Sequence, residues 1–174
     1  VQDSDKVFAG AIAASKVVTG FGFDLNGGTD PPRRFVGVAF AGDDPSQFLP
    51  QQARTVETLP LLVAAAKGNG SVNTDYESVV IRRVPMMFRL AGQAGLFPAL
   101  SIEAVRVAQG AGTYFIKSSG ASGELSFGQS TGMVSIKTGD VIVPTDGRGQ
   151  LTLFDTGHVP QRFISALAVF RDKV

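Results

Sequence analysis

The densest charge cluster in the sequence is a pair of consecutive arginines, Arg82 and Arg83, inside a β-rich stretch at residues 79–90. Asp75 and Glu77 lie just upstream. A guanidinium can hold a carboxylate or phosphate through two parallel hydrogen bonds. Consecutive strand residues point to opposite faces, so only one arginine can reach a given site. The pair predicts an anion-binding residue or, as the alternative, one solvated arginine and one that bridges to the upstream carboxylates.

Other polar residues lie near the ends of predicted strands, where they can line a binding site. Tyr76 and Tyr114 are the only tyrosines, and each combines an apolar ring with a polar tip. Either can therefore line a pocket or lie half-buried in the core. The residues that we expect to contact a ligand are Arg82 or Arg83, Asn73, Asp75 and Tyr114.

The single histidine, His158, limits the catalytic chemistry, and the chain has no cysteine. A serine hydrolase triad would need His158, a serine, and Asp155 or Asp146 to orient the imidazole. Nothing marks such a serine, and His158 follows Gly157 and precedes Pro160, as a loop residue would. A lone histidine also needs several carboxylates to hold a metal. We predict no catalytic residue, no metal site and no cofactor, and keep a small hydrolase that uses His158 as the last alternative.

The balance of charges sets limits on the partners. The 174 residues include 16 Lys and Arg and 15 Asp and Glu, giving a net charge of +1. This balance does not favour nonspecific nucleic-acid binding, and the basic residues 31–34 (PPRR) are expected to form a solvated loop. The longest nearly apolar stretch, residues 59–66, is far shorter than the roughly 18 residues of a membrane-spanning helix.

The length fits one domain over residues 1–174. Because the chain opens on Val1 and not on methionine, we expect a fragment that lacks an N-terminal portion.

Alternating hydrophobicity and turn residues predict several strands. They cover residues 17–25, 35–40, 71–73, 79–90, 113–117, 133–137, 141–143 and 151–155. The alternation slips at Arg82 and Arg83, where we expect a bulge, a twist or an exchange between sheets.

Four segments have helical periodicity. Their boundary signals are an N-cap at Asp3 or Ser4, an N-cap at Thr58 with an end at Gly68, an end at Gly110 for residues 98–109, and a start near Pro160. The last helix carries an apolar stripe of Phe163, Leu167, Phe170 and Val174. We expect this stripe to pack on the core or, alternatively, on a partner helix. Without strict βαβ alternation, the pattern predicts an α+β or mixed α/β fold, with a central, mainly antiparallel sheet and about four helices packed on it.

Four motifs occur in an order that resembles the CHASE2 family of bacterial extracytoplasmic sensor domains. Residues 68–75 (GNGSVNTD) resemble its G-x-V-N segment, and residues 79–86 (VVIRRVPM) resemble its V-x-R-R-V-P strand. Residues 97–104 (FPALSIEA) resemble its P-S-L-A/E-x-A element, and residues 141–151 (VIVPTDGRGQL) resemble its I-P-T-D-x-x-G-x-L hairpin. The family's N-terminal W-P-W-x-R segment is absent.

The resemblance implies a ligand-sensing role on the periplasmic side of the inner membrane. CHASE2 domains belong to transmembrane receptors whose outputs include nucleotide cyclases, histidine kinases and serine/threonine kinases. The domain itself would not be an enzyme. It would respond to an unidentified small molecule or environmental signal and would touch the membrane only through flanking helices outside this chain. No residue role is carried over, because the family's ligands are largely unknown. A homodimer or a non-sensing interaction module is the alternative.

Overall fold

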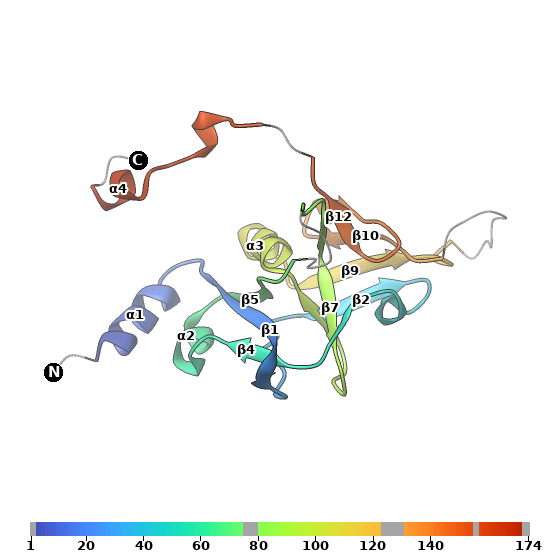
Figure 1. The fold of residues 1–174 in the computed structure, drawn as a ribbon, viewed down its shortest axis with the longest axis horizontal. Helices are drawn as coiled ribbons and strands as arrows, with labels where there is room; N and C mark the ends of the chain where they lie inside the picture. Colours follow the sequence, from blue (N-terminus) through green and yellow to red (C-terminus); the bar gives the residue numbers. More distant parts are fainter. Residues whose placement is uncertain (1–2, 75–79, 123–130, 155–156, 172–174) are drawn as a thin grey trace.

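The computed structural model describes residues 3–74, 80–122, 131–154 and 157–171 (Figure 1). In chain order the elements are α1 (Ser4–Ala13), β1 (Val18–Gly28), β2 (Gly37–Ala41), the 3-10 turn η1 (Pro45–Gln47), β3 (Gln51–Gln52), β4 (Thr55–Glu57), α2 (Pro60–Ala65), β5 (Gly68–Ser71), β6 (Arg83–Pro85), β7 (Met87–Leu90), β8 (Leu96–Pro98), α3 (Leu100–Gln109), β9 (Thr113–Ser118), β10 (Met133–Thr138), β11 (Val141–Pro144), β12 (Gln150–Thr152), the 3-10 turn η2 (Pro160–Arg162) and α4 (Ala166–Phe170). The described residues thus form four α-helices among mostly antiparallel strand pairs, which confirms the predicted α+β class.

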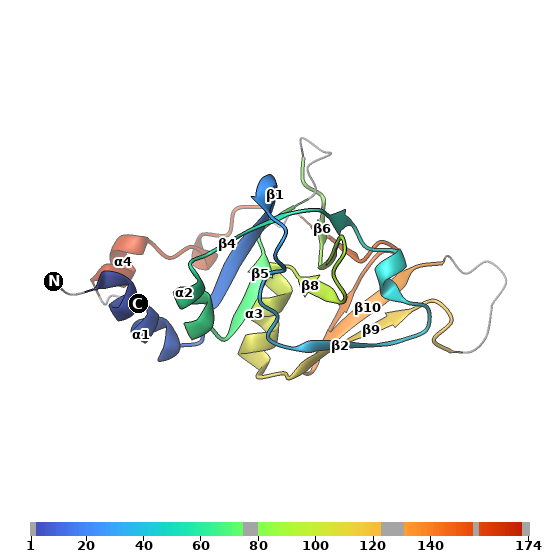
Figure 2. The same cartoon turned by 90° about the horizontal axis from the view of Figure 1, so that it is seen from below.

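The strands form four small sheets in place of one central sheet. Their strand orders are β4-β1-β5, β11-β10-β9-β2, β3-β7-β8 and β12-β6. The pairs β1–β5, β2–β9 and β3–β7 are parallel, and the other pairs are antiparallel. Figures 1 and 2 place α3 in the middle of the molecule, between the sheet that contains β1 and the sheet that contains β9.

Within the stretch predicted as β-rich, residues 83–90 form two strands that belong to different sheets. β6 pairs with β12, whereas β7 pairs with β3 and β8. The break falls at Met86, whose N–H donates to the Gly149 carbonyl and whose carbonyl accepts from the Ala99 N–H. The prediction of a strand exchange is therefore right in kind, but its position at Arg82 and Arg83 is wrong.

Two glycines of β5 allow α3 to lie close against this strand. A Cβ atom on Gly70 would lie 2.6 Å from the Leu100 Cα, and one on Gly68 would lie 2.4 Å from the Glu103 Oε1. Both separations are far below van der Waals contact. Gly68 therefore begins a buried strand that carries α3, where the sequence predicted the end of a helix.

The predicted helix boundaries are partly confirmed. The Asp3 carboxylate caps α1 by accepting from the Lys6 N–H. Thr58 does not cap α2, because its hydroxyl donates to the Gly20 carbonyl of β1 at 2.8 Å. α3 ends at Gly110, whose φ of +64° is the expected left-handed C-cap.

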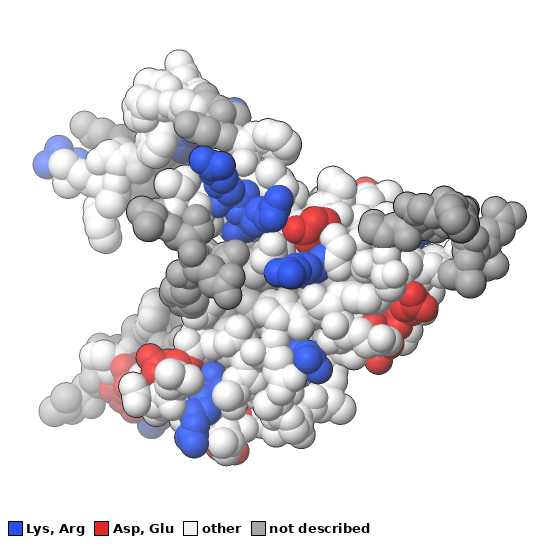
Figure 3. Space-filling view, turned by 45° about the vertical axis from the view of Figure 1, so that its right-hand side comes forward, with Lys and Arg blue, Asp and Glu red and all other residues white. Residues whose placement is uncertain are grey.

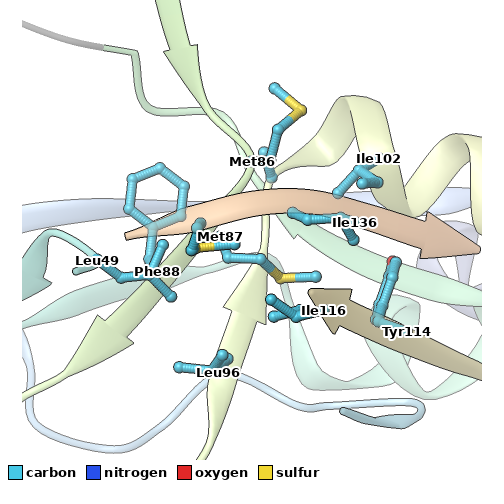
Figure 4. Close-up of a cluster of buried hydrophobic side chains, with 11 residues drawn as sticks. Leu49, Met86, Met87, Phe88, Leu96, Ile102, Tyr114, Ile116 and Ile136 are labelled. Atoms are coloured by element: carbon cyan, nitrogen blue, oxygen red, sulfur yellow. The ribbon is translucent and has the colours of Figure 1, made fainter. Parts of the chain in front are cut away.

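The main core lies where β7 and β8 meet the β9–β10 pair and α3 (Figure 4). Met87, Ile116 and Ile136 are fully buried there. The remaining buried members are Leu49, Met86, Phe88, Leu96, Ala99, Ile102, Tyr114 and Met133. A second apolar cluster joins α1 to α2, so α1 packs on a helix and not on a sheet.

The C-terminal segment runs away from the sheets (Figure 1). Phe163, Leu167 and Phe170 are 66%, 54% and 87% exposed, so the described part of the apolar stripe does not pack on the core. That expectation was wrong, and Val174 lies outside the described residues. In both ribbon views α4 and α1 lie toward the same end of the molecule (Figures 1 and 2).

Candidate functional site

A groove of about 700 Å³ opens beside the edge strand β2. Its walls are β2, η1, β3, β7 and the turn at residues 91–95 that joins β7 to β8. We call it the β2–β7 groove. Small-molecule sites have volumes of about 300–1,000 Å³, so the groove has the size of a ligand site.

Arg89 brings a positive charge to the groove from inside a buried strand. Its neighbours in β7, Phe88 and Leu90, are both buried in the core. The Arg89 N–H donates to the Pro50 carbonyl, which fixes the backbone next to β3. The Arg89 Nε is shielded from solvent and has no hydrogen-bond partner. A buried donor without a partner costs free energy, so the described residues do not fully compensate the Arg89 guanidinium.

Arg34 supplies a second guanidinium from the loop before β2. Its Cζ lies 5.4 Å from the centroid of the Phe97 ring, in cation–π contact. Gly95, at φ +96°, makes room for it, because a Cβ atom there would lie 1.6 Å from the Arg34 Nη1. Arg34 takes part in no ion pair with any described residue. The turn glycine therefore positions an uncompensated cation at the groove.

The rest of the groove combines a few polar groups with an apolar wall. Asp44 is the one acidic residue among the described lining residues, and its Oδ1 accepts from the Ser46 N–H at 2.9 Å. Phe40 lines the apolar side and is 49% exposed. Two cations and one anion give the lining a net positive charge.

A second group of charged residues lies nearby but is closed. The Arg106 Nε and Nη2 donate to both carboxylate oxygens of Glu103, at 2.9 and 2.8 Å, and its other contacts are two backbone carbonyls. The Tyr114 hydroxyl also donates to Glu103, as does the Asn69 N–H. Glu103, Arg106 and Tyr114 are all buried, and we call them with Asn69 the Glu103 network. Burial and the Glu103 carboxylate raise the pKa of Tyr114 above its ordinary value, and the hydrogen bonds that Arg106 donates to Glu103 raise the pKa of Arg106.

Tyr114, predicted as a ligand contact, is therefore held in the core with its hydroxyl bound to Glu103. Arg34 connects the two regions, because it also lines a cavity of about 10 Å³ beside Tyr114 and Glu103. That space is too small for a ligand.

The predicted arginines lie away from the β2–β7 groove. Arg82 is exposed, and its carbonyl accepts from the Leu153 N–H. Arg83 lines a separate groove of about 590 Å³, where its Nε lies 3.9 Å from the Asp146 Oδ2. This ion-pair partner comes from the turn before β12, and the expected partners, Asp75 and Glu77, lie outside the described residues.

Asn73 takes the place of a strand residue beside β1. Its Oδ1 accepts from the Phe23 N–H at 2.6 Å and its Nδ2 donates to the Phe23 carbonyl. The side chain is buried, and through these two hydrogen bonds it continues the pairing along β1. Asp75 lies outside the described residues. The structure therefore does not bring Asn73, Arg83 and Tyr114 to one site.

His158 is exposed, and its ring stacks on Phe163 with a centroid distance of 4.8 Å. No hydrogen bond joins it to a serine or carboxylate among the described residues, and Asp155 lies outside them. The hydrolase alternative gains no support from this placement.

Sequence reasoning missed both groove arginines. Arg34 belongs to the PPRR segment that was expected to be a solvated loop. Arg89 interrupts the run of apolar residues 84–91, and a single charge in such a run was the available signal.

The surface and the helices add three observations. Basic and acidic residues form small separate groups on the face shown in Figure 3. Within the described ranges, no three His, Asp or Glu side chains cluster closely enough to hold a metal ion. None of the helices there has the length and apolarity that crossing a membrane requires.

The chain was compared with known proteins. No family model, no curated protein and no solved structure matches it.

Proposed function

We propose that this chain is the extracytoplasmic ligand-sensing domain of a bacterial transmembrane signalling receptor, with the β2–β7 groove as its ligand site. The output would be a cytoplasmic nucleotide cyclase or histidine kinase. The observation that carries the proposal is the groove itself, which has the volume of a small-molecule site and is lined by two arginines, Arg34 and Arg89.

The positions of the terminal helices support a signalling role. α1 and α4 lie toward the same end of the molecule (Figures 1 and 2). A domain linked to a membrane through both of its ends needs this arrangement. A ligand that binds one conformation better shifts the population toward it, and such a shift can move α1 relative to α4.

The first test is a ligand screen on the purified chain. Thermal unfolding is followed with organic anions, zwitterions, neutral sugars and cations. A ligand at 100 times its Kd adds about 2.7 kcal/mol to the free energy of unfolding. Amide hydrogen exchange then shows where a hit acts, and we expect slower exchange in the groove together with a change in α1 or α4. Sensing is contradicted if no compound stabilises the chain, or if binding leaves both helices unchanged.

The location is tested on the full-length protein in intact cells. In spheroplasts, protease added from outside should digest this domain while a cytoplasmic control protein stays intact. Protection of the domain would contradict the extracytoplasmic placement.

A second candidate function is a non-sensing interaction module that acts as a homodimer. The observation that favours it is the exposed apolar C-terminal segment, in which Ile164 is 62% and Val169 is 55% exposed. Light scattering during gel filtration should then report a dimer, and replacing Ile164 and Phe170 with serine should return it to a monomer. A monomer at all concentrations would remove this candidate.

A further inference from the structure

We propose that the β2–β7 groove recognises an oxyanion, a carboxylate or phosphate group, on a small molecule with an uncharged apolar body. Arg89 and Arg34 hold the anionic head, and the wall that includes Phe40 accepts the body. The inference rests on the proposed function in one respect, because it takes the same groove as the ligand site.

Arg89 lines the groove, and its guanidinium makes no ion pair with any described residue. Its Nε is shielded from solvent and has no partner, so a ligand in the groove meets the outer part of the guanidinium. A carboxylate or phosphate oxygen there would form a charge-assisted hydrogen bond, which is about twice as strong as a neutral one. An apolar or cationic ligand head would form no such bond.

Arg34 lines the same groove from the loop before β2. It is exposed, and its guanidinium is held by the Phe97 ring and by the space at Gly95, not by any carboxylate. The groove therefore has two guanidinium groups, and neither forms an ion pair with a described residue. Two such groups favour a planar or tetrahedral oxyanion over a single point charge.

The volume and lining of the groove limit the size and charge of the ligand. A head group alone would fill only a small part of about 700 Å³. Phe40 and Leu96 line the remainder with apolar surface. Asp44 adds one negative charge to the lining and opposes a polyanion. An organic acid or a phosphate monoester with a ring or short chain fits these conditions.

The test uses three probes of similar shape: benzoate, phenyl phosphate and the neutral benzamide. Each is titrated into the ¹⁵N-labelled chain at constant ionic strength, and amide shifts give the site and the Kd. We expect benzoate and phenyl phosphate to shift amides of β2, β7 and residues 91–95, and benzamide to bind much more weakly. The tighter of the two anions identifies the head group as carboxylate or phosphate.

The variants are Arg89→Leu, Arg34→Ala and the control Arg83→Leu, which removes an equal charge from the other groove. Arg89→Leu should weaken anion binding by roughly 10- to 100-fold, since a hydrogen bond to a charged group contributes that much. Arg83→Leu should leave the Kd unchanged. If Arg89→Leu does not fold, Arg34→Ala at its exposed position and Arg89→Lys, which keeps the charge but loses the fork, provide the same comparison.

Two results would overturn the oxyanion site: equal binding of benzamide and benzoate, or unchanged anion affinity in the folded Arg89 and Arg34 variants. A neutral or cationic compound that binds the groove would overturn it too, while leaving the proposed sensing function intact. Conversely, anion binding that leaves α1 and α4 unchanged in hydrogen exchange would support the oxyanion site and contradict sensing.

Discussion

Two regions of this molecule use arginine in opposite ways. In the Glu103 network, Arg106 is buried and its donors reach a carboxylate and two backbone carbonyls. In the β2–β7 groove, Arg89 keeps a buried Nε without any partner, and Arg34 has no carboxylate beside it. Arg34 lines the groove and also a small cavity that Glu103 and Tyr114 line.

The difference separates a structural role from a binding role. A buried ion pair in which every guanidinium nitrogen is hydrogen-bonded fixes the positions of the elements that carry it, here α3, β5 and β9. These bonds leave little donor capacity for a ligand. The groove arginines form no ion pair with the described residues, so their N–H groups are better suited to binding a ligand than to holding the fold together. Variants of the two regions should therefore affect different measurements.

The largest effect is expected from breaking the Glu103 network on one side. Arg106→Met leaves the buried Glu103 carboxylate without its cation, and breaking a buried pair in this way costs about 3–5 kcal/mol. The free energy of unfolding, measured with urea, should fall by that amount. Arg89→Leu is the matched variant in the groove and should change stability by less than about 1 kcal/mol. A similar loss in both variants would show that the groove arginine is structural as well.

The next largest effect is the stabilisation of the chain by a bound ligand, and it should depend only on the groove. With an oxyanion ligand at 100 times its Kd, the chain should gain about 2.7 kcal/mol of stability. Arg89→Leu should lose this gain at the same concentration. Tyr114→Phe, which alters the Glu103 network, should retain it. If Tyr114→Phe also lost the gain, the two regions would act as one site.

The contrast between the regions also explains what the sequence could predict. Local signals were sufficient for α1 with its Asp3 cap, for the C-cap at Gly110 and for the β10–β11 hairpin around Gly139. These features depend on a few consecutive residues. The α+β class followed from the same signals.

Long-range pairing was not predictable from local pattern. Residues 83–90 divide at Met86 because β6 finds β12 and β7 finds β3 and β8. The Thr58 hydroxyl donates a hydrogen bond to the carbonyl of Gly20, a residue far away in the sequence, and does not cap α2. The groove has the same origin, because Arg34 and Arg89 become neighbours only when β2 and β7 enter the fold. Charge clusters in the sequence therefore drew attention to Arg82 and Arg83, whereas the arginines that line the groove are Arg34 and Arg89.

The Glu103 network should make the free energy of unfolding depend on pH, with a slope of about 1.4 kcal/mol per pH unit above pH 10. The pKa of Tyr114 is raised above its ordinary value of 10.0 by burial, with the hydrogen bond to Glu103 as the second cause. Above pH 10 the unfolded chain loses this phenolic proton while the folded chain keeps it, so stability falls as pH rises. Below pH 10 the proton is bound in both states and contributes no slope.

Urea unfolding between pH 9 and 11.5 measures this slope, and Tyr114→Phe removes it. Tyr76 remains in both proteins, so its titration and that of the lysines cancel in the difference. Parallel stability curves for the two proteins above pH 10 would show that the Tyr114 hydroxyl ionises in the folded state.

The smallest expected effect on stability comes from the turn at residues 91–95, where two glycines form a matched pair. Gly92 has φ +73° and Gly95 has φ +96°, so alanine at either position introduces backbone strain of roughly 1 kcal/mol. A Cβ atom on Gly92 meets nothing within 4 Å, whereas one on Gly95 overlaps the Arg34 guanidinium. The guanidinium is at the end of the flexible Arg34 side chain and can move away from the added Cβ atom, so the two variants should be similarly stable. Only Gly95→Ala should displace Arg34, and it should weaken oxyanion binding while Gly92→Ala leaves the Kd unchanged. Equal Kd values in the two variants would mean that the position of Arg34 does not matter for binding, and Arg89 alone would then carry the recognition.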